Sequence, residues 1–229
     1  MKKTLDFLRG LQENNNREWF EAHRDTYLTV KAATEHLAAR LIEGIASFDD
    51  SVSGLTPRDC TYRIYRDIRF SHDKRPYKSH IGIYVCPGGK KSGHAGYYLH
   101  IEPEHAPAPD GSTGGCLLAA GLYMPPPAVL HSVREEMLFN GEAFIRNLKR
   151  AEGFAPDTTN SLKRVPTGFP ADCPCAEYLK LKDVFLERPV SETFMLADDM
   201  PERAVELFRT TADFNRQLNR AVDYALETM

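Results

Sequence analysis

The sequence predicts an α+β fold: a mainly antiparallel sheet of about four or five strands, from the middle of the chain, packed against N-terminal and C-terminal helices. Apolar residues recur every three or four positions before residue 46 and again from residue 129, which is typical of helices. Between residues 60 and 123 the period shortens to two, which is typical of strands. The connections between these strands are short, so neighbouring strands should run antiparallel.

The N-terminal region predicts a short helix over residues 4–11 and, after the Asn-rich break at 14–16, a long helix whose apolar face continues to Ile45. Asn15, with Glu18 three positions later, resembles a capping box at the start of the long helix. The predicted strands are 61–70, 80–85, 96–102 and 116–123, with a further short strand at 184–186. Helical periodicity resumes after three prolines, at 129–137 and 144–148, and the last helix is predicted over about 201–226.

The composition fits one soluble domain. A chain of 229 residues, 42% hydrophobic and 27% charged, can bury one substantial core, so we expect a single domain over residues 1–229. No apolar run reaches eighteen residues, and the N-terminus turns amphipathic too early for a secretory signal. We therefore expect a cytoplasmic protein without a membrane partner. The five cysteines should be reduced thiols, and Cys173 and Cys175 offer two ligands where a structural zinc needs four.

One segment is strongly basic. The net charge of the chain is −3, but residues 58–91 contain nine Lys or Arg and only three Asp. A local positive patch on an otherwise acidic protein suits a compact anionic ligand better than a long polyanion.

Strand alternation predicts where these charges lie. If residues 61–70 form a strand, matching the apolar sides of the strands gives one polar sheet face that presents Arg63, Asp67, Arg69, His80, Tyr98, His100 and Glu102. Arg66 falls on the apolar side, where a charge must be paired. Lys74, Tyr77 and Lys78 follow in the adjoining loop.

These positions predict an anion site. Arginine presents paired donors that fit phosphate or carboxylate. The residues predicted to hold the ligand are Arg63, Arg66, Arg69, Lys74, Tyr77, Lys78 and Tyr98. Asp67 would orient arginines or act as a general base, and His80 or His100 would transfer protons if the protein is an enzyme. The sequence indicates no cofactor.

Three alternatives stay open. His100 and Glu102 could bind a metal with His80 or His94, but no H-E-x-x-H spacing supports it, and no metal site is predicted. The basic segment could bind nucleic acid without catalysis. It could also be an internal network of Arg–Asp pairs in a structural or interaction protein. Neither catalysis nor the oligomeric state is decided by the sequence.

The pattern Arg63-x-x-Arg66-Asp67-x-Arg69-Phe70-x-x-Asp73-Lys74-x-x-Tyr77 resembles the signature of the domain-of-unknown-function family 2461, conserved hypothetical proteins of bacteria and fungi. Further similar stretches are Asn14 to Phe20, Pro87-Gly88-Gly89 with Gly96-Tyr97-Tyr98, and Lys163 to Pro170. The loop from Pro103 to Gly115 is longer and richer in Pro and Gly than the family suggests. The resemblance implies one family domain and brings no activity, substrate or cofactor.

Overall fold

The protein is described by a computed structural model that covers residues 1–70, 72–104 and 113–228. Helices surround one antiparallel sheet, which confirms the predicted α+β class. In the described part of the chain the helices are α1 (Lys2–Glu13), α2 (Arg17–Ala22), α3 (Arg24–Ala46), the short 3-10 helix η1 (Asp50–Val52), α4 (Pro57–Cys60), α5 (Pro127–Phe139), α6 (Gly141–Arg150), α7 (Ala176–Leu179), α8 (Glu192–Leu196), α9 (Met200–Arg209) and α10 (Ala212–Thr228). None of these helices is long and apolar enough to cross a membrane.

Among the described residues the sheet has five strands in the order β1-β2-β3-β5-β4, and every neighbouring pair is antiparallel. The strands are β1 (Ile81–Val85), β2 (Gly96–Ile101), β3 (Leu117–Leu122), β4 (Ala155–Pro156) and β5 (Val184–Pro189). The predictions for β1, β2, β3 and β5 are therefore confirmed, apart from their ends. The alternation of apolar and polar residues located them because one face of the sheet is buried.

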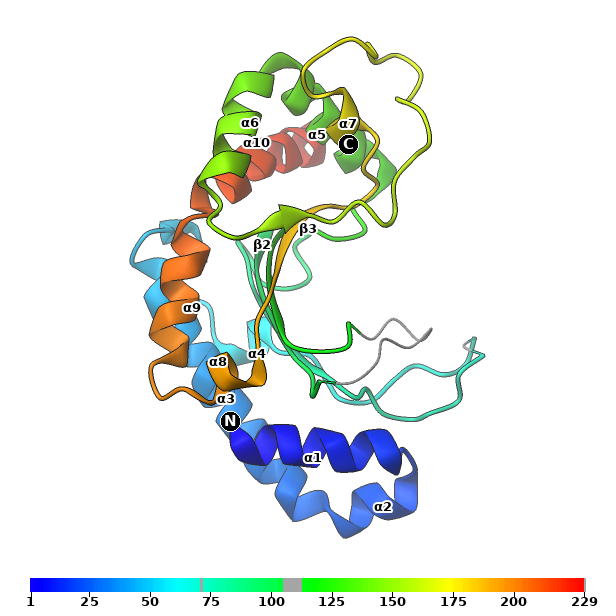
Figure 1. Cartoon of the computed structure of the whole chain (residues 1–229), viewed down its shortest axis with the longest axis vertical. Coiled ribbons are helices and arrows are strands. Elements are labelled where there is room, and N and C mark those ends of the chain that lie inside the picture. Colours follow the sequence, from blue (N-terminus) through cyan, green and yellow to red (C-terminus); the bar gives the residue numbers. More distant parts are fainter. Residues whose placement is uncertain (71, 105–112, 229) are drawn as a thin grey trace.

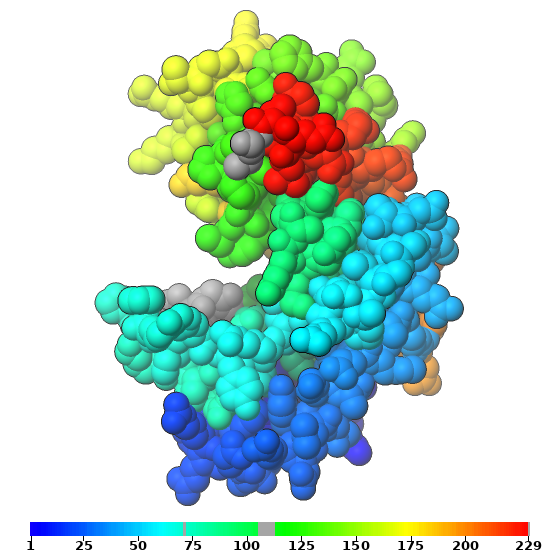
Figure 2. Space-filling view, turned by 180° about the vertical axis from the view of Figure 1, so that it is seen from behind, coloured from blue at the N-terminus to red at the C-terminus, as the bar shows by residue number. Residues whose placement is uncertain are grey.

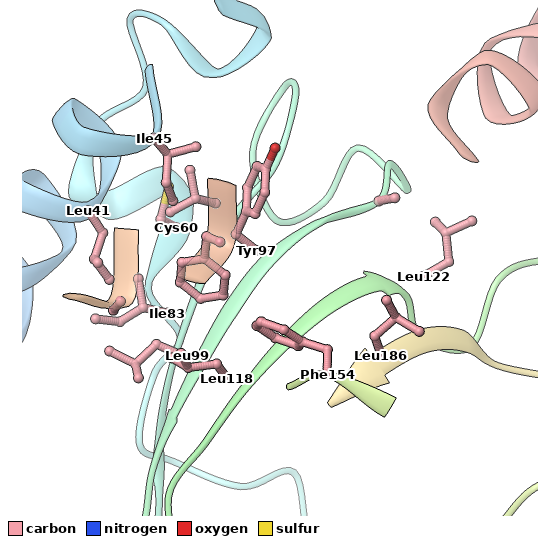
Figure 3. Close-up of a cluster of buried hydrophobic side chains, with 14 of the residues drawn as sticks. Leu41, Ile45, Cys60, Ile83, Tyr97, Leu99, Leu118, Leu122, Phe154 and Leu186 are labelled. Carbon is pink, nitrogen blue, oxygen red and sulfur yellow. The ribbon is translucent and has the colours of Figure 1, made fainter. Parts of the chain in front are cut away.

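The core lies on one face of this sheet. Ile83, Leu99 and Leu118 point from three neighbouring strands toward Leu41 and Ile45 of α3 (Figure 3). All five side chains are at most 1% exposed. Burying an aliphatic side chain of this size contributes about 1.5–3 kcal/mol. This face of the sheet is thus fixed against the helical layer, and the opposite face is left to carry polar residues.

Helix α1 extends beyond the predicted residues 4–11 at both ends, and α2 begins one residue later than predicted. Asn16, rather than Asn15, caps α2, and its side chain accepts a hydrogen bond of 2.9 Å from the backbone N–H of Trp19. The predicted long helix is divided at His23, so that α2 and α3 are separate helices. The predicted last helix is likewise divided, into α9 and α10.

The prediction of a strand over residues 61–70 was wrong. Thr61 forms an isolated bridge with Ile83 of β1, and the chain then leaves the sheet and pairs with itself. The backbone N–H of Arg66 donates to the carbonyl of Pro76 at 2.9 Å, and Lys78 N–H donates to Ile64 at 2.8 Å. Residues 61–80 thus form an irregular hairpin, called the basic arm below. Charged residues and a proline lacking an N–H explain why this segment does not continue as a sheet strand.

The second face of the sheet differs from the first in having no described helix packed across its middle. Figure 1 shows α3, α4 and α9 on one side of the curved sheet, and no described helix lies across the middle of the other side. Helices α5, α6 and α10 lie at one end of the sheet, and the basic arm projects at the other. Seen from behind, this side forms a hollow between the arm and the upper helices (Figure 2). We call the sheet surface in this hollow the open face.

Candidate functional site

The basic arm is held by the N-terminal helices. The Asn15 side chain donates to the carbonyl of Tyr77 at 3.0 Å and accepts from its N–H at 3.1 Å, as a neighbouring strand would. The Tyr77 ring stacks on Phe20, with ring centroids 4.0 Å apart and planes 10° apart. Tyr77 is only 3% exposed, so its ring supports the arm from within the core and does not face a ligand. Two motifs distant in the sequence therefore meet here.

The charges at the tip of the arm are largely paired with one another. Asp73 accepts hydrogen bonds from the guanidinium groups of Arg66 and Arg75, the latter at 2.8–3.1 Å. Asp67 and Arg69 form a two-point pair at 2.6 and 2.9 Å. Arg66 is half-buried and paired with Asp73, although it lies on the arm and not on the apolar side of a strand. These contacts belong to an internal network, and ligand binding by Arg66 and Arg69 stays a prediction.

Replacing Asp73 with asparagine is expected to lower the free energy of unfolding at pH 7 by about 1–2 kcal/mol, because charge-assisted hydrogen bonds at a partly exposed site are lost. Arg75 and Arg66 hold the pKa of the Asp73 carboxyl well below its usual range. A depressed pKa stabilises the fold above the unfolded value of about 3.9, and the gain is lost as the pH falls below it. The difference between wild type and Asp73→Asn in urea unfolding should therefore shrink between pH 7 and pH 3. Asp172→Asn, at an exposed site, should have the free energy of unfolding of the wild type at both pH values. If Asp172→Asn and Asp73→Asn change this free energy equally, the Asp73 network does not stabilise the fold.

A row of hydrogen-bonded polar side chains crosses the open face along β2. The hydroxyl of Tyr98 lies 3.0 Å from Nδ1 of His100, and Nε2 of His100 lies 3.0 Å from Oε2 of Glu102. The backbone N–H of Thr113 donates to the same carboxylate oxygen at 3.0 Å, and its hydroxyl lies 3.0 Å from that oxygen and 2.7 Å from the carbonyl oxygen of Gly115. Glu102 is fully buried, and the hydrogen bond from the Thr113 N–H stabilises a negative charge on this oxygen.

Gly82 of β1 makes room for this row. It is paired with His100 across the strands, and a Cβ atom at Gly82 would lie 2.6 Å from the Tyr98 hydroxyl. A strand glycine often marks such a close approach. Burial raises the pKa of Tyr98 well above its usual value, so the phenol keeps its proton at neutral pH.

His80 joins this row from the base of the arm. Its ring stacks on that of His100, with centroids 4.6 Å apart. The potential metal-binding atoms of His80, His100 and Glu102 all lie within 4.8 Å of one another. His94 is not part of the group, since its Nε2 lies 2.8 Å from the carboxylate of Asp223 on α10. Of the two histidines that the sequence offered as a third ligand, His80 lies with His100 and Glu102, and His94 does not.

Three cations gather beside the row. Thr61 pairs with Ile83, so Tyr62 next to it points to the open face, and Lys78 and Lys90 place their ammonium groups 5.4 and 6.0 Å from its ring centroid. Burial lowers the pKa of Lys78, and the nearby charge of Arg63 lowers it further. Among the residues that the structure describes, neither Lys78 nor Arg63 forms an ion pair.

The two ends of the open face differ in charge. Strand register places Glu187 of β5 on this face, in line with Ala119 and Tyr98. It lines a pocket with Glu104 and Asp157, and burial and the charge of Asp157 raise its pKa. An anion in the hollow is therefore favoured at the Lys78 end.

The predicted site residues divide into two groups. The open face brings together His80, Tyr98, His100 and Glu102, with Lys78 at its edge. Three residues predicted for the sheet face are instead on the arm, because the first strand does not form: Arg63, Asp67 and Arg69. Lys74 also lies there, donating to the carbonyl of Ile68.

Sequence reasoning missed three residues of this site. Gly82 carried a usable signal, because a glycine within a strand indicates close packing. Thr113 carried none, since it reaches Glu102 from beyond a long connection. Tyr62 was assigned to the apolar side by the incorrect strand.

The protein is thus an α+β protein in which helices cover one face of an antiparallel sheet, and a polar, partly basic hollow lies on the other face. The chain belongs to the family of conserved hypothetical proteins DUF2461, whose sequence model matches residues 3–216. This confirms the family resemblance, and the match includes every site residue named above. The comparison with curated proteins and the comparison with solved structures found no match.

Proposed function

We propose that the protein binds a compact anion, bearing phosphate or carboxylate, at the basic end of the open face. The observation that carries this proposal is Lys78: a half-buried ammonium group near Arg63 and Lys90, with no ion pair among the described residues. Like charges brought together out of water repel one another, and a bound anion would relieve this cost.

The neighbouring side chains would orient the anion. Tyr62 lies under Lys78 and Lys90, and its hydroxyl supplies a hydrogen-bond donor. His80 and His100 lie on the same face, so a reaction on the bound anion would take place at these histidines. Asp67, paired with Arg69 on the arm, would serve to orient that arginine and not as a general base.

Thermal unfolding with a panel of anions tests this proposal: inorganic phosphate, pyrophosphate, a nucleoside monophosphate, citrate and oligothymidylate. A ligand that binds only the folded state raises its stability by mass action. We expect one small anion to raise the melting temperature of the wild type and to bind Lys78→Met about 10–100-fold more weakly, as the loss of a charge-assisted contact implies. Lys91→Met, at an exposed position in the neighbouring hairpin, removes the same charge and should bind normally.

If Lys78→Met and Lys91→Met lose anion affinity equally, the loss results from the change in net charge and not from a site at Lys78. Stabilisation by none of the small anions, with EDTA present throughout, would overturn the proposal.

A second candidate, binding of single-stranded nucleic acid, is favoured by the arm itself. Phe70 is 94% exposed, and the Arg69 guanidinium carbon lies 5.9 Å from its ring centroid. Exposed aromatic rings beside arginine stack with bases. Binding confined to oligothymidylate, weakened steeply by salt and lost in Phe70→Ala, would favour this candidate over the compact anion.

A further inference from the structure

Two imidazoles and one carboxylate converge on the open face. His80, His100 and Glu102 each offer one ligand atom, and these atoms lie within 4.8 Å of one another. A metal ion 2.0–2.2 Å from two such atoms holds them about 3–4 Å apart, so a small closing movement of the His80 ring would let the three atoms share one ion. His100 lies on β2 and Glu102 directly follows that strand, so their spacing of two residues places them on one face, and His80 directly precedes β1.

The surroundings of His100 match those of a metal-bound histidine. Such a histidine uses one ring nitrogen for the metal, and its other nitrogen is usually hydrogen-bonded to a neighbouring group that fixes the ring. Here Nδ1 lies 3.0 Å from the Tyr98 hydroxyl, while Nε2 points to the Glu102 carboxylate. With a metal at Nε2, Nδ1 carries the proton and donates to Tyr98. The hydrogen bond from the Thr113 N–H orients the carboxylate in the same way.

We propose that His80, His100 and Glu102 form a binding site for one divalent transition-metal ion. Imidazole nitrogen favours ions of the zinc, iron and cobalt type over magnesium and calcium, which prefer oxygen ligands. Three protein ligands leave at least one coordination position for water or a ligand, as in catalytic metal sites. This inference goes beyond the proposed anion binding and does not depend on it.

Zinc alone is the probe that tests the site. Protein treated with EDTA and then freed of it would be titrated with Zn²⁺ in competition with a chromophoric chelator, and Co²⁺ would be added separately to record its visible absorption. We expect one equivalent of Zn²⁺ and a Co²⁺ spectrum of a low-coordinate site with nitrogen and oxygen ligands. Tyr98→Phe should weaken Zn²⁺ binding about 10-fold, and His80→Ala by more, since it removes a ligand.

His80→Ala is chosen because His80 is only half-buried, whereas His100 and Glu102 are buried in the sheet and their variants could fail to fold. His131→Ala, on the surface of α5, is the matched control and should bind Zn²⁺ as the wild type does. Equal affinity of wild type and His80→Ala, or the absence of Zn²⁺ binding by the wild type, would overturn the proposal. Lys78→Met should bind Zn²⁺ as the wild type does, and the anion assay contains EDTA, which removes metal ions. The failure of one proposal can therefore be distinguished from the failure of the other.

Discussion

Replacing Phe20 with alanine is expected to lower the free energy of unfolding by about 3–5 kcal/mol, the usual cost of removing a large buried aromatic side chain. Phe20 is 1% exposed and stacks on Tyr77, with Tyr27 and Tyr65 at ring-centroid distances of 5.0 and 5.8 Å. It therefore joins the N-terminal helices to the basic arm. Urea unfolding at pH 7 measures the change in stability.

In the same variant the basic arm should unfold locally more readily than the rest of the protein. Without Phe20 the Tyr77 ring loses its stacking partner in the N-terminal helices, and the two Asn15 hydrogen bonds remain as a polar link between these helices and the arm. Trypsin under native conditions should then cut faster within residues 61–80 than it cuts the wild type. Phe139→Ala, at a position 78% exposed, should change the stability by less than about 0.5 kcal/mol. A Phe20→Ala protein as stable as this control, or with unchanged cleavage of the arm, would disprove the anchoring role.

The predicted and observed structures agree where one local pattern fixes the outcome. Strands β1 and β2 place an apolar residue at every second position because one face packs on the helices, so the shared face of Tyr98, His100 and Glu102 could be predicted from a spacing of two residues. The same reasoning failed for residues 61–70, whose polarity also alternates. There the hydrogen-bonding partner is the returning half of the arm, and alternation does not identify the partner.

The contacts of the charged residues in the arm depend on which segment pairs with residues 61–70. The prediction that arginines line a sheet face required a strand, whereas the hairpin turns Asp73 back onto Arg66 and Arg75. Pairing at a separation of seven residues depends on turn geometry, which no periodicity contains. The sequence placed His80 on the same face as His100 and Glu102, but how closely its ring approaches His100 depends on the register between β1 and β2, which residue spacing does not give.

Gly82→Ala is expected to disable the open-face site at a moderate cost in stability. Its new Cβ atom would lie 2.6 Å from the Tyr98 hydroxyl and 2.7 Å from the ring, so the phenol must move away from His100. Overpacking of this kind costs about 1–3 kcal/mol. The Tyr98–His100 hydrogen bond should be lost, which the imidazole ¹⁵N resonances of His100 would report, and Zn²⁺ affinity should fall by about 10-fold or more.

Two companion variants separate the causes of this result. Tyr98→Phe removes the hydroxyl without adding bulk, so it should give the same change in the His100 resonances with a smaller loss of packing. Gly141→Ala adds a methyl group at the start of α6, where the nearest atom would be 3.7 Å away, and should leave both the resonances and Zn²⁺ binding unchanged. If Gly82→Ala keeps the wild-type His100 resonances, then Tyr98 does not hold that ring, and the contacts of His100 with Glu102 and His80 must fix it instead.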